Sequence, residues 1–421
     1  MRSFLKFFII RIMWMGALRI YKGEKPFVVV VGGSVGKTST KEALAEVLAQ
    51  KGRPVRKTFG NLATDSGVPL SLLGFQDPPA GAWDWLEVIF RALTARPKLK
   101  PEDKPIYVLE YSSDIEGETD FLVERIAPDV AVYCTLVPVH MEQYGTEEVM
   151  VRETLRLHST LRPNGFIVAN ADDPHQVKAF KGNESVQWYG KRAKDGVQLK
   201  ASNMTDRGLV LTYALDGSEK TVQTAVLADY QLLPILATIA VGTNIGMTEK
   251  QLHKGIEDYT LPPGRGKLVA GKNDMTIIDD TANSSPEAVK AGLQVLASYA
   301  GERRKVAILG SMNELGELAL EAHKEVAAVA ATKADFFIAV GKYSNDMLRS
   351  ARDAGLSPIQ MIAFPGPVEL KDHLFQLVHR NDVIFIKASQ NGMFLERIVK
   401  ELMAKPEDAP KLLVRQGAFW Q

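Results

Sequence analysis

The feature that most constrains the fold of this chain is a buried-strand pattern, a glycine loop and a helix pattern in direct succession. Residues 28–31 are four consecutive valines, the loop holds Gly33 and Gly36, and Lys37 and Thr38 open the helix. Such a loop lets backbone N–H groups face an anion, and the following helix directs the positive end of its dipole at the same point. The succession therefore predicts a phosphate-binding turn in an α/β fold.

Lys37 and Thr38 have the side chains that a nucleotide phosphate site needs. A lysine at this place can reach the β- and γ-phosphates, and a threonine hydroxyl is a suitable Mg²⁺ ligand. The usual P-loop has a further glycine where this chain has Val31, so the loop is shorter than usual. The alternative is a strand-to-helix turn whose glycines serve only to make it tight. The four valines before it and the helical pattern after it favour the nucleotide site.

Size and charge are those of an ordinary globular protein. The chain has 421 residues, 51 Lys and Arg, 50 Asp and Glu, and a net charge of +1. The length is enough for two or three domains, and the balanced charge predicts no nucleic-acid partner. The single cysteine, Cys134, excludes a disulfide framework and fits a cytoplasmic location. We expect it to be a small buried core residue.

The first 22 residues differ from the rest of the chain. They contain five basic residues and no acidic one, and most of the others are large and apolar. Arg11 interrupts the apolar run, so neither side reaches the about 18 residues that a membrane-spanning helix needs. No small-residue cleavage site of a signal peptide follows. We expect a basic apolar helix over residues 1–25. Peripheral contact of residues 1–22 with the inner face of a membrane, and packing on the protein or on a partner subunit, are both open.

From residue 27 onward, short apolar runs alternate with helical patterns. This alternation predicts parallel sheets covered by helices. We expect an α/β protein with a P-loop central domain of mainly parallel sheet, residues 26–262, and a Rossmann-like α/β C-terminal domain, residues 263–421. Turn residues at 261–266 mark the boundary, and 197–226 has the pattern of a small antiparallel insertion. The predicted strands are 27–31, 106–109, 130–135, 166–169, 306–309, 336–340 and 383–386, and the predicted helices are 41–50, 147–161, 285–299, 317–331 and 395–403.

Polar residues follow several of these strands. Glu110 follows the strand at 106–109, His140 comes shortly after 130–135, and Asp280 ends a short apolar run. In open α/β sheets the ligand binds outside the carboxyl ends of the strands. A carboxylate and an imidazole near a phosphate loop can hold Mg²⁺ directly or through water. For each residue alone, a solvated loop position is the plain alternative.

Together, and in this order, the motifs resemble the Mur ligase superfamily, and the resemblance covers nearly all of residues 28–404. The block at 309–316 and the segment at 387–393 are most similar to the branch that adds D-alanyl-D-alanine to a muramoyl tripeptide. The motifs are Gly33-Ser34-Val35-Gly36-Lys37-Thr38-Ser39-Thr40-Lys41-Glu42, Val108-Leu109-Glu110, His140-Met141-Glu142, Pro263-Gly264-Arg265, Ile277-Ile278-Asp279-Asp280 through Asn283, and Leu309-Gly310-Ser311-Met312-Asn313-Glu314-Leu315-Gly316.

The resemblance implies an ATP-dependent carboxylate–amine ligase in peptidoglycan precursor or related cell-wall peptide synthesis. Such enzymes phosphorylate a substrate carboxylate, and an incoming amine then displaces the phosphate from the acyl phosphate. The partners would be small-molecule or peptide acids and amines, and the cofactors would be ATP and Mg²⁺. By the same resemblance, the catalytic residues are Lys37, Glu110, His140 and Arg265, the Mg²⁺ ligands are Thr38, Glu110 and His140, and the nucleotide contacts are Gly33, Ser34, Gly36, Lys37, Thr38, Ser39, Asp280 and Asn283.

The chain also departs from the family pattern. Only about 25 residues precede the first strand, so we expect no N-terminal domain that binds the UDP sugar. Thr154 stands where the family usually has a carbamoylated lysine that bridges a second Mg²⁺. Ser311 replaces an Asp, and Gln390 replaces an Arg in the region that holds the amine substrate's carboxylate, which removes a bidentate clamp.

Two alternative functions follow from these departures. One is a nucleotide-binding pseudo-ligase that acts as a scaffold at the membrane, which would bind ATP without turnover. The other is a ligase of the same architecture that makes a different amino-acid conjugate. The intact Lys37, Thr38 and Glu110 favour an active ligase.

Overall fold

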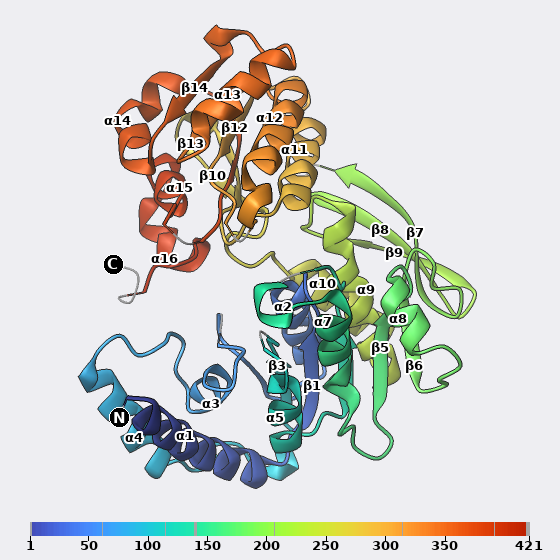
Figure 1. Cartoon of the computed structure of the whole chain (residues 1–421). Helices are drawn as coiled ribbons and strands as arrows, with labels where there is room; N and C mark the ends of the chain where they lie inside the picture. The colour runs from blue at the N-terminus through green and yellow to red at the C-terminus, as the bar shows by residue number, and fades with distance from the viewer. Residues whose placement is uncertain are drawn as a thin grey trace. The chain divides into compact units, whose positions relative to one another are not determined.

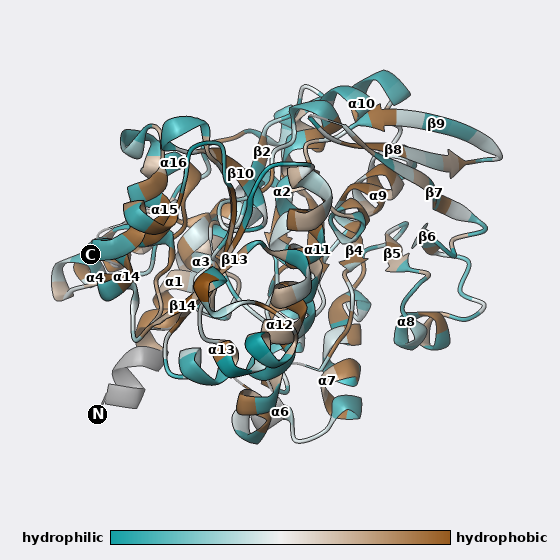
Figure 2. Cartoon of the chain, turned by 90° about the horizontal axis from the view of Figure 1, so that it is seen from above, coloured by the Kyte–Doolittle hydropathy of each residue, from teal (hydrophilic) through white to brown (hydrophobic). Residues whose placement is uncertain are grey.

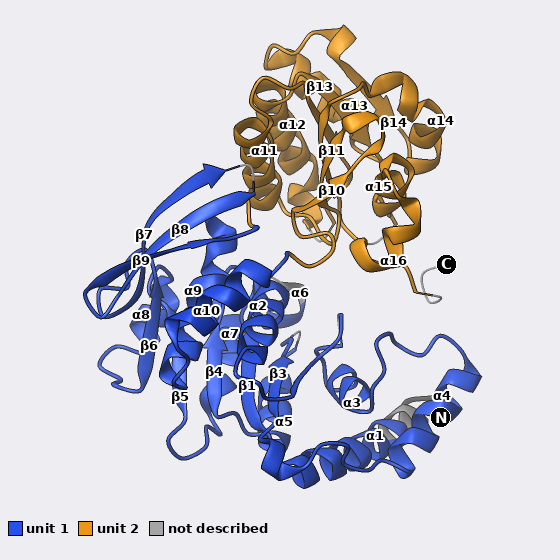
Figure 3. Ribbon diagram, turned by 180° about the vertical axis from the view of Figure 1, so that it is seen from behind, with its two compact units in different colours: residues 1–225, 229–260 blue, residues 226–228, 261–421 orange. Residues whose placement is uncertain are grey.

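The computed structural model describes residues 2–60, 62–113, 115–138, 141–205, 207–313, 315–390 and 392–417, with side chains from residue 8 onward except those of 141 and 142. His140 and Glu314, which the sequence motifs include, lie outside the described residues. The chain divides into two compact units (Figure 3). Unit 1 comprises residues 1–225 and 229–260, and unit 2 comprises residues 226–228 and 261–421.

Unit 1 is built on a nine-stranded sheet with the order β2-β3-β1-β4-β5-β6-β7-β8-β9 (Figure 1). Neighbouring strands are parallel from β2 to β7, and β7, β8 and β9 are antiparallel. The strands are β1 (Phe27–Gly32), β2 (Val55–Lys57), β3 (Ile106–Glu110), β4 (Val130–Tyr133), β5 (Phe166–Asn170), β6 (Val186–Gly190), β7 (Gly196–Thr205), β8 (Gly208–Leu215) and β9 (Ser218–Gln223).

Helices cover both faces of this sheet. Val28 and Val30 of β1 pack with residues of α1 and α5. Because successive strand residues point to opposite faces, Val29 and Val31 lie on the other face, where α2, α9 and α10 pack. Figure 2 shows that α9 is apolar along most of its length, as expected for a buried helix. The helices are α1 (Arg2–Glu24), α2 (Lys37–Ala49), α3 (Gly67–Leu72), α4 (Ala82–Leu93), α5 (Glu118–Arg125), α6 (Met141–Tyr144), α7 (Glu147–Thr154), α8 (Pro174–Ala179), α9 (Asp229–Asn244) and α10 (Glu249–Asp258).

Unit 2 contains a six-stranded sheet with the order β10-β11-β15-β12-β13-β14, in which β10 alone is antiparallel to its neighbour. One face packs against α14, α15 and α16, and the other packs against α11, α12 and α13. The elements are β10 (Lys267–Ala270), β11 (Thr276–Asp280), α11 (Pro286–Ala300), β12 (Lys305–Leu309), α12 (Ala319–Lys333), β13 (Phe336–Val340), α13 (Ser344–Asp353), β14 (Met361–Phe364), α14 (Pro367–Leu377), β15 (Val383–Lys387), α15 (Glu396–Leu402) and α16 (Ala409–Leu412). Short 3₁₀ turns lie at Pro101–Asp103, Leu155–His158, Lys272–Asp274, Gly316–Leu318, Pro358–Gln360 and Pro406–Asp408.

The predicted fold class, α/β with mainly parallel sheets, is confirmed, and three details differ from the sequence prediction. The segment at 197–226 is antiparallel as predicted, but β7 pairs with β6, so these strands continue the main sheet instead of forming a separate insertion. The helix predicted over 147–161 ends at Thr154 and continues as a 3₁₀ turn to His158. Helix α4 was not predicted, although its charged residues Asp84, Glu87 and Arg91 recur at the spacing of one helix face.

Helix α1 packs on unit 1 by two of its sides. Trp14 and Ala17 join the core beneath the sheet, and Met13 and Ile20 join a second core with α4. Gly16 allows α1 and α4 to touch, since a Cβ there would lie 2.4 Å from the carbonyl oxygen of Ala92. Among the described residues, no helix is long and apolar enough to span a bilayer.

Glu24 fixes the end of α1 through a buried carboxylate. It accepts hydrogen bonds from Tyr107 Oη at 2.7 Å and from the N–H groups of Lys98 and Leu99 at 2.8 and 3.2 Å, and it pairs with Arg56 at 3.1 Å. This carboxylate therefore connects α1, β2, β3 and the segment after α4.

Replacing this carboxylate tests the connection. We expect Glu24→Ala to lower the free energy of unfolding by about 3 kcal/mol, because it leaves buried donors and the Arg56 charge without their acceptor. The exposed Lys22, two residues earlier, provides the control, and Lys22→Ala should change stability by about 0.5 kcal/mol or less. Denaturant unfolding measures both variants, and equal stabilities would contradict the assignment.

Asp279 is a second buried carboxylate that connects segments of the chain, in this case in unit 2. Its buried carboxylate accepts hydrogen bonds from Gly264 N at 3.0 Å, Thr281 N at 3.2 Å and Thr281 Oγ1 at 2.6 Å. Burial raises the pKa of Asp279 to about 6, although these hydrogen bonds oppose the shift.

This raised pKa makes the stability of unit 2 depend on pH. The folded carboxyl binds its proton more tightly than the unfolded one, whose pKa is near 3.8. Its contribution to stability is therefore present below about pH 4 and is lost as the pH rises to about 6, by at most roughly 3 kcal/mol. We expect the wild type to gain stability relative to Asp279→Asn when the pH is lowered from 7 to 4.5. Denaturant unfolding at the two pH values measures it, and a constant difference would contradict the prediction.

Candidate active site

The loop between β1 and α2 has the backbone geometry that its glycines predict. Gly33 and Gly36 have φ angles of 128° and 98°, which disfavour any other residue. A Cβ on Gly33 would also lie 2.9 Å from the Cys134 carbonyl oxygen. The N–H groups of Ser34 and Val35 both donate to the Thr135 carbonyl, at 3.0 and 3.1 Å. The first part of the loop is thus tied to the end of β4, next to the buried Cys134.

The beginning of α2 provides the donors for an anion. No side chain caps the helix at Gly36, and its first turn contains no acidic residue. The N–H groups of the first helical residues have no partner within the helix, and the dipole adds positive potential there. Lys37 Nζ donates to the carbonyls of Gly33 at 2.7 Å and Ser34 at 3.1 Å, so its ammonium lies against the loop. A phosphate group fits this arrangement of charge and donors.

Thr38 and Glu110 meet at the carboxyl ends of neighbouring strands. Glu110 is the last residue of β3, which pairs with β1, and its Oε1 accepts a hydrogen bond from Thr38 Oγ1 at 3.0 Å. Lys41 Nζ lies 3.4 Å from Glu110 Oε2 and 3.2 Å from Glu42 Oε1, and Glu42 also pairs with Lys57. Lys41 is fully buried. Alternating charges therefore run from Lys57 to the Thr38–Glu110 pair.

The residues here fit a magnesium ion. Glu110 Oε2 is buried and accepts no hydrogen bond from the described residues, and its ion pair with Lys41 is long at 3.4 Å, so this anionic oxygen can also face a metal cation. The hydroxyl of Thr38 beside it is another hard oxygen ligand, of the kind that Mg²⁺ prefers. No group of three His, Cys, Asp or Glu side chains able to hold a metal occurs in the described part of the chain. A site that takes one carboxylate and a hydroxyl from the protein suits Mg²⁺, because this ion keeps several waters and binds substrate phosphates.

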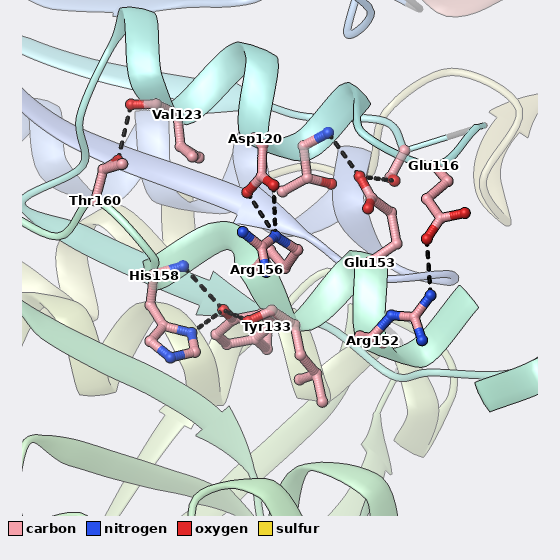
Figure 4. A network of polar contacts seen from close by, with 12 residues as sticks. Glu116, Asp120, Val123, Tyr133, Arg152, Glu153, Arg156, His158 and Thr160 are labelled. Atoms are coloured by element: carbon pink, nitrogen blue, oxygen red, sulfur yellow. Dashed lines mark hydrogen bonds and ion pairs between the residues drawn. The ribbon is translucent and has the colours of Figure 1, made fainter. Parts of the chain in front are cut away.

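A polar network fixes the helices beside this site (Figure 4). Arg156 makes two 2.6 Å hydrogen bonds to Asp120 of α5, and Glu153 accepts from the Thr119 N–H at 2.9 Å. Thr154 uses its hydroxyl within α7, where it donates to the Met150 carbonyl at 2.9 Å, and Ser34 Oγ lies 3.8 Å from the Met150 sulfur. The Thr154 hydroxyl is therefore already bonded to its own helix. By the family resemblance, a bridging carboxylate was expected at this position.

Unit 2 brings together three of the predicted residues. Asp280 Oδ2 lies 2.7 Å from Lys387 Nζ, which also donates to the carbonyl of Asn283 at 2.8 Å. Burial raises the pKa of Asp280, although the nearby charges of Lys387 and Arg265 oppose this shift. Asn283 Oδ1 accepts from the Ser284 N–H at 2.9 Å, and the buried hydroxyl of Ser284 has no partner among the described residues.

Sequence reasoning missed two residues of these clusters as site residues. Lys41 and Lys387 were part of motifs but received no role. Lys41 could have been found from its spacing, because it lies three residues after Thr38 and therefore on the same side of α2. Lys387 ends β15, which pairs with β11, so its contact with Asp280 follows only from the strand order of the sheet.

The comparisons with known proteins agree with this geometry. Residues 31–242 match the family described as Mur ligase middle domain, and residues 264–390 match the Mur ligase, glutamate ligase domain. A Bacillus subtilis protein named UDP-N-acetylmuramoyl-tripeptide–D-alanyl-D-alanine ligase is 30% identical over 384 residues, which are 90% of this chain and 76% of that protein.

Two solved structures of MurF ligases are also similar to this chain. MurF ligase from Thermotoga maritima in complex with ADP matches with a TM-score of 0.74 and 25% identity over 95% of this chain and 84% of that one. MurF from Acinetobacter baumannii matches with a TM-score of 0.76 and 22% identity over 94% and 80%. The family resemblance seen in the sequence motifs is thereby confirmed. This chain belongs to the Mur ligase family and is a Mur-type ATP-dependent ligase, similar to the MurF branch.

Proposed function

We propose that this chain joins a carboxylate substrate to an amine substrate through an acyl phosphate, with ATP and Mg²⁺. The single observation that carries the proposal is the contact between Thr38 and Glu110 at the start of α2, with Lys37 against the same loop. The γ-phosphoryl group passes from ATP to a carboxylate oxygen and leaves ADP. The amine nitrogen then attacks the acyl carbon, the C–O bond to phosphate breaks, and the nitrogen loses a proton as the amide forms.

The residues of unit 1 have distinct parts in this reaction. The first N–H groups of α2 bind phosphate oxygens, and Lys37 neutralises charge on the transferred group. Thr38 Oγ1 and Glu110 Oε2 are the proposed magnesium ligands, and Mg²⁺ supplies charge neutralisation between the phosphates when it is bound. Lys41, whose ammonium lies 3.4 Å from Glu110 Oε2, holds that carboxylate directed at Thr38. His140 stays a proposed third ligand from the sequence.

The residues of unit 2 are proposed nucleotide contacts. Arg265 supplies a guanidinium that suits a phosphate, as proposed from the sequence. Asp280 and Asn283 are held by Lys387, which fixes their backbone and side-chain positions. The buried hydroxyl of Ser284, without a partner among the described residues, offers one further polar contact in this segment.

The acid and amine are proposed from the relatives. Relatives with the name UDP-N-acetylmuramoyl-tripeptide–D-alanyl-D-alanine ligase support a muramoyl peptide as the acid and D-alanyl-D-alanine as the first amine to test. By the resemblance, Gln390 stands where the family has an Arg in the region that holds the amine's carboxylate, and it brings no positive charge. Since a guanidinium clamps a carboxylate in two places, its replacement favours an amine that depends less on a terminal carboxylate.

A phosphate-release assay tests the proposed reaction. The purified protein is given ATP, Mg²⁺ and UDP-muramoyl tripeptide, with D-alanyl-D-alanine or with its C-terminal amide. We expect amide product and stoichiometric phosphate, and a higher relative rate with the amide than a MurF relative shows. ATP binding without turnover for any pair would favour the pseudo-ligase scaffold, and turnover only with other amino acids would favour the alternative conjugate.

Removing the Thr38 hydroxyl tests the metal site. We expect Thr38→Val to lower kcat/KM roughly 100-fold, about 3 kcal/mol, because it deletes one proposed Mg²⁺ ligand at nearly constant volume. Thr38→Ser keeps the hydroxyl and is the matched control. Rates measured over a range of Mg²⁺ concentrations should show a higher requirement for the valine variant alone. Unchanged magnesium dependence in Thr38→Val would contradict the role of this hydroxyl.

Removing the Lys41 charge tests the positioning of Glu110. In Lys41→Met the Glu110 carboxylate loses its nearest cation and is no longer held in place. We therefore expect a roughly tenfold increase in the Mg²⁺ concentration that gives half the maximal rate. Lys41→Arg should restore most of it. The matched control is Lys57→Met, which removes the cation at the other end of the charge series. Thermal unfolding shows whether each variant is folded, and equal Mg²⁺ dependence in the two methionine variants would overturn this role for Lys41.

A further inference from the structure

Helix α4 carries a row of large apolar side chains that the solvent reaches. Trp83, Leu86, Phe90 and Leu93 have exposed fractions of 83%, 55%, 67% and 52%. Their spacing of three and four residues places them on one side of the helix, and we refer to these four residues as the α4 outer stripe. The opposite side is the buried one, where Val88 and Ala92 are fully buried in the core shared with α1. The fold of unit 1 therefore does not need this stripe.

Basic residues lie around the C-terminal half of the stripe, whereas the acidic Asp84 and Glu87 lie beside its first half. Arg19 of α1 donates to the Leu93 carbonyl at 3.0 Å, which places a guanidinium at the C-terminal end of the stripe. Arg91 lies next to Phe90 and pairs with Glu87 at 2.6 Å, and Arg96 and Lys98 follow the helix as exposed residues. Four cations thus gather at or beyond the second half of α4.

The exposed side of α1 has the same composition. Among the side chains of α1 that the structure describes, the exposed ones are those of Phe8, Arg11, Met15, Arg19 and Lys22, again three or four apart, and none is acidic. Figures 1 and 3 show α1 and α4 next to each other, and the two helices run in the same direction, because Gly16 lies against Ala92 and Gly23 lies against Pro97, four residues after the end of α4. This part of unit 1 therefore combines exposed aromatic and aliphatic side chains with cations.

From this composition we propose that α1 and α4 bind peripherally to an anionic lipid surface. Tryptophan, phenylalanine and leucine enter the boundary between headgroups and acyl chains, and arginine and lysine bind the lipid phosphates. The helices lie on the membrane and do not cross it, in accord with the absence of a spanning helix among the described residues.

Charge favours lipid over a second copy of the chain. A cationic surface repels an identical cationic surface, whereas it attracts anionic headgroups. The proposal does not depend on the ligase reaction.

Vesicle binding by the full chain tests the proposal. Vesicles of phosphatidylcholine alone and vesicles with 40% phosphatidylglycerol are used in co-sedimentation at low and high salt. We expect binding to the anionic vesicles that falls at least tenfold in 0.5 M salt, and little binding to the neutral ones. The fluorescence of Trp83 should shift to shorter wavelength with anionic vesicles, and this shift should be missing in Trp83→Phe.

Substitutions separate the stripe from other exposed apolar residues. We expect Trp83→Ser with Phe90→Ser, and separately Arg11→Gln with Lys22→Gln, to weaken vesicle binding at least tenfold. Ile359→Ser is the matched control, because Ile359 is 87% exposed on unit 2 and lies outside the proposed surface. ATP turnover and thermal unfolding should be unchanged in all three. Equal binding to neutral vesicles, no effect of the stripe variants, or a dimer in sedimentation analysis that the stripe variants abolish would each overturn the proposal.

Discussion

The structure of the proposed site depends on the buried charges of Lys41 and Glu110. A fully buried lysine is costly unless carboxylates face it, and here Glu110 and Glu42 lie within 3.4 and 3.2 Å of its ammonium. The register of β1 and β3 sets this geometry, because Val31 pairs with Glu110 and the chain reaches α2 a few residues later. An apolar sheet thus holds a carboxylate at its end, and a lysine one turn into the next helix directs that carboxylate toward Thr38.

The sequence predicted the elements whose pattern is local. The strand of four valines, the glycine turn at Gly33 and Gly36, and the strands at 106–109, 336–340 and 383–386 follow from side-chain periodicity and turn chemistry. Contacts that depend on strand order could not be predicted in this way. Lys387 reaches Asp280 because β15 lies between β11 and β12, although β15 comes last along the chain. The loop also departs from the expectation that its N–H groups face an anion, because those of Ser34 and Val35 donate to the Thr135 carbonyl.

The contacts of Thr154 show how the chain accommodates a residue that departs from the family pattern. Its hydroxyl donates to the Met150 carbonyl one turn earlier, a contact that threonine makes readily inside a helix. Met150 in turn lies against Ser34 of the phosphate loop. The neighbourhood of the loop on this side is therefore a thioether and a satisfied hydroxyl, both poor ligands for a hard dication. Among the described residues, this side of the loop therefore offers nothing that replaces the bridging carboxylate of the family pattern.

The two charged regions of unit 1 have opposite physical designs. At the phosphate loop, the Lys37 ammonium is held by hydrogen bonds to the carbonyls of Gly33 and Ser34. Because its position is set by these contacts, it can act on one ligand in one geometry. On α1 and α4, most of the cations are exposed on flexible side chains beside apolar ones, which suits a fluid surface with many equivalent anions. A substitution that abolishes the first function should leave the second intact. The two activities can therefore be separated by single residues, and a membrane-bound enzyme without turnover is as accessible to experiment as an active enzyme that no longer binds lipid.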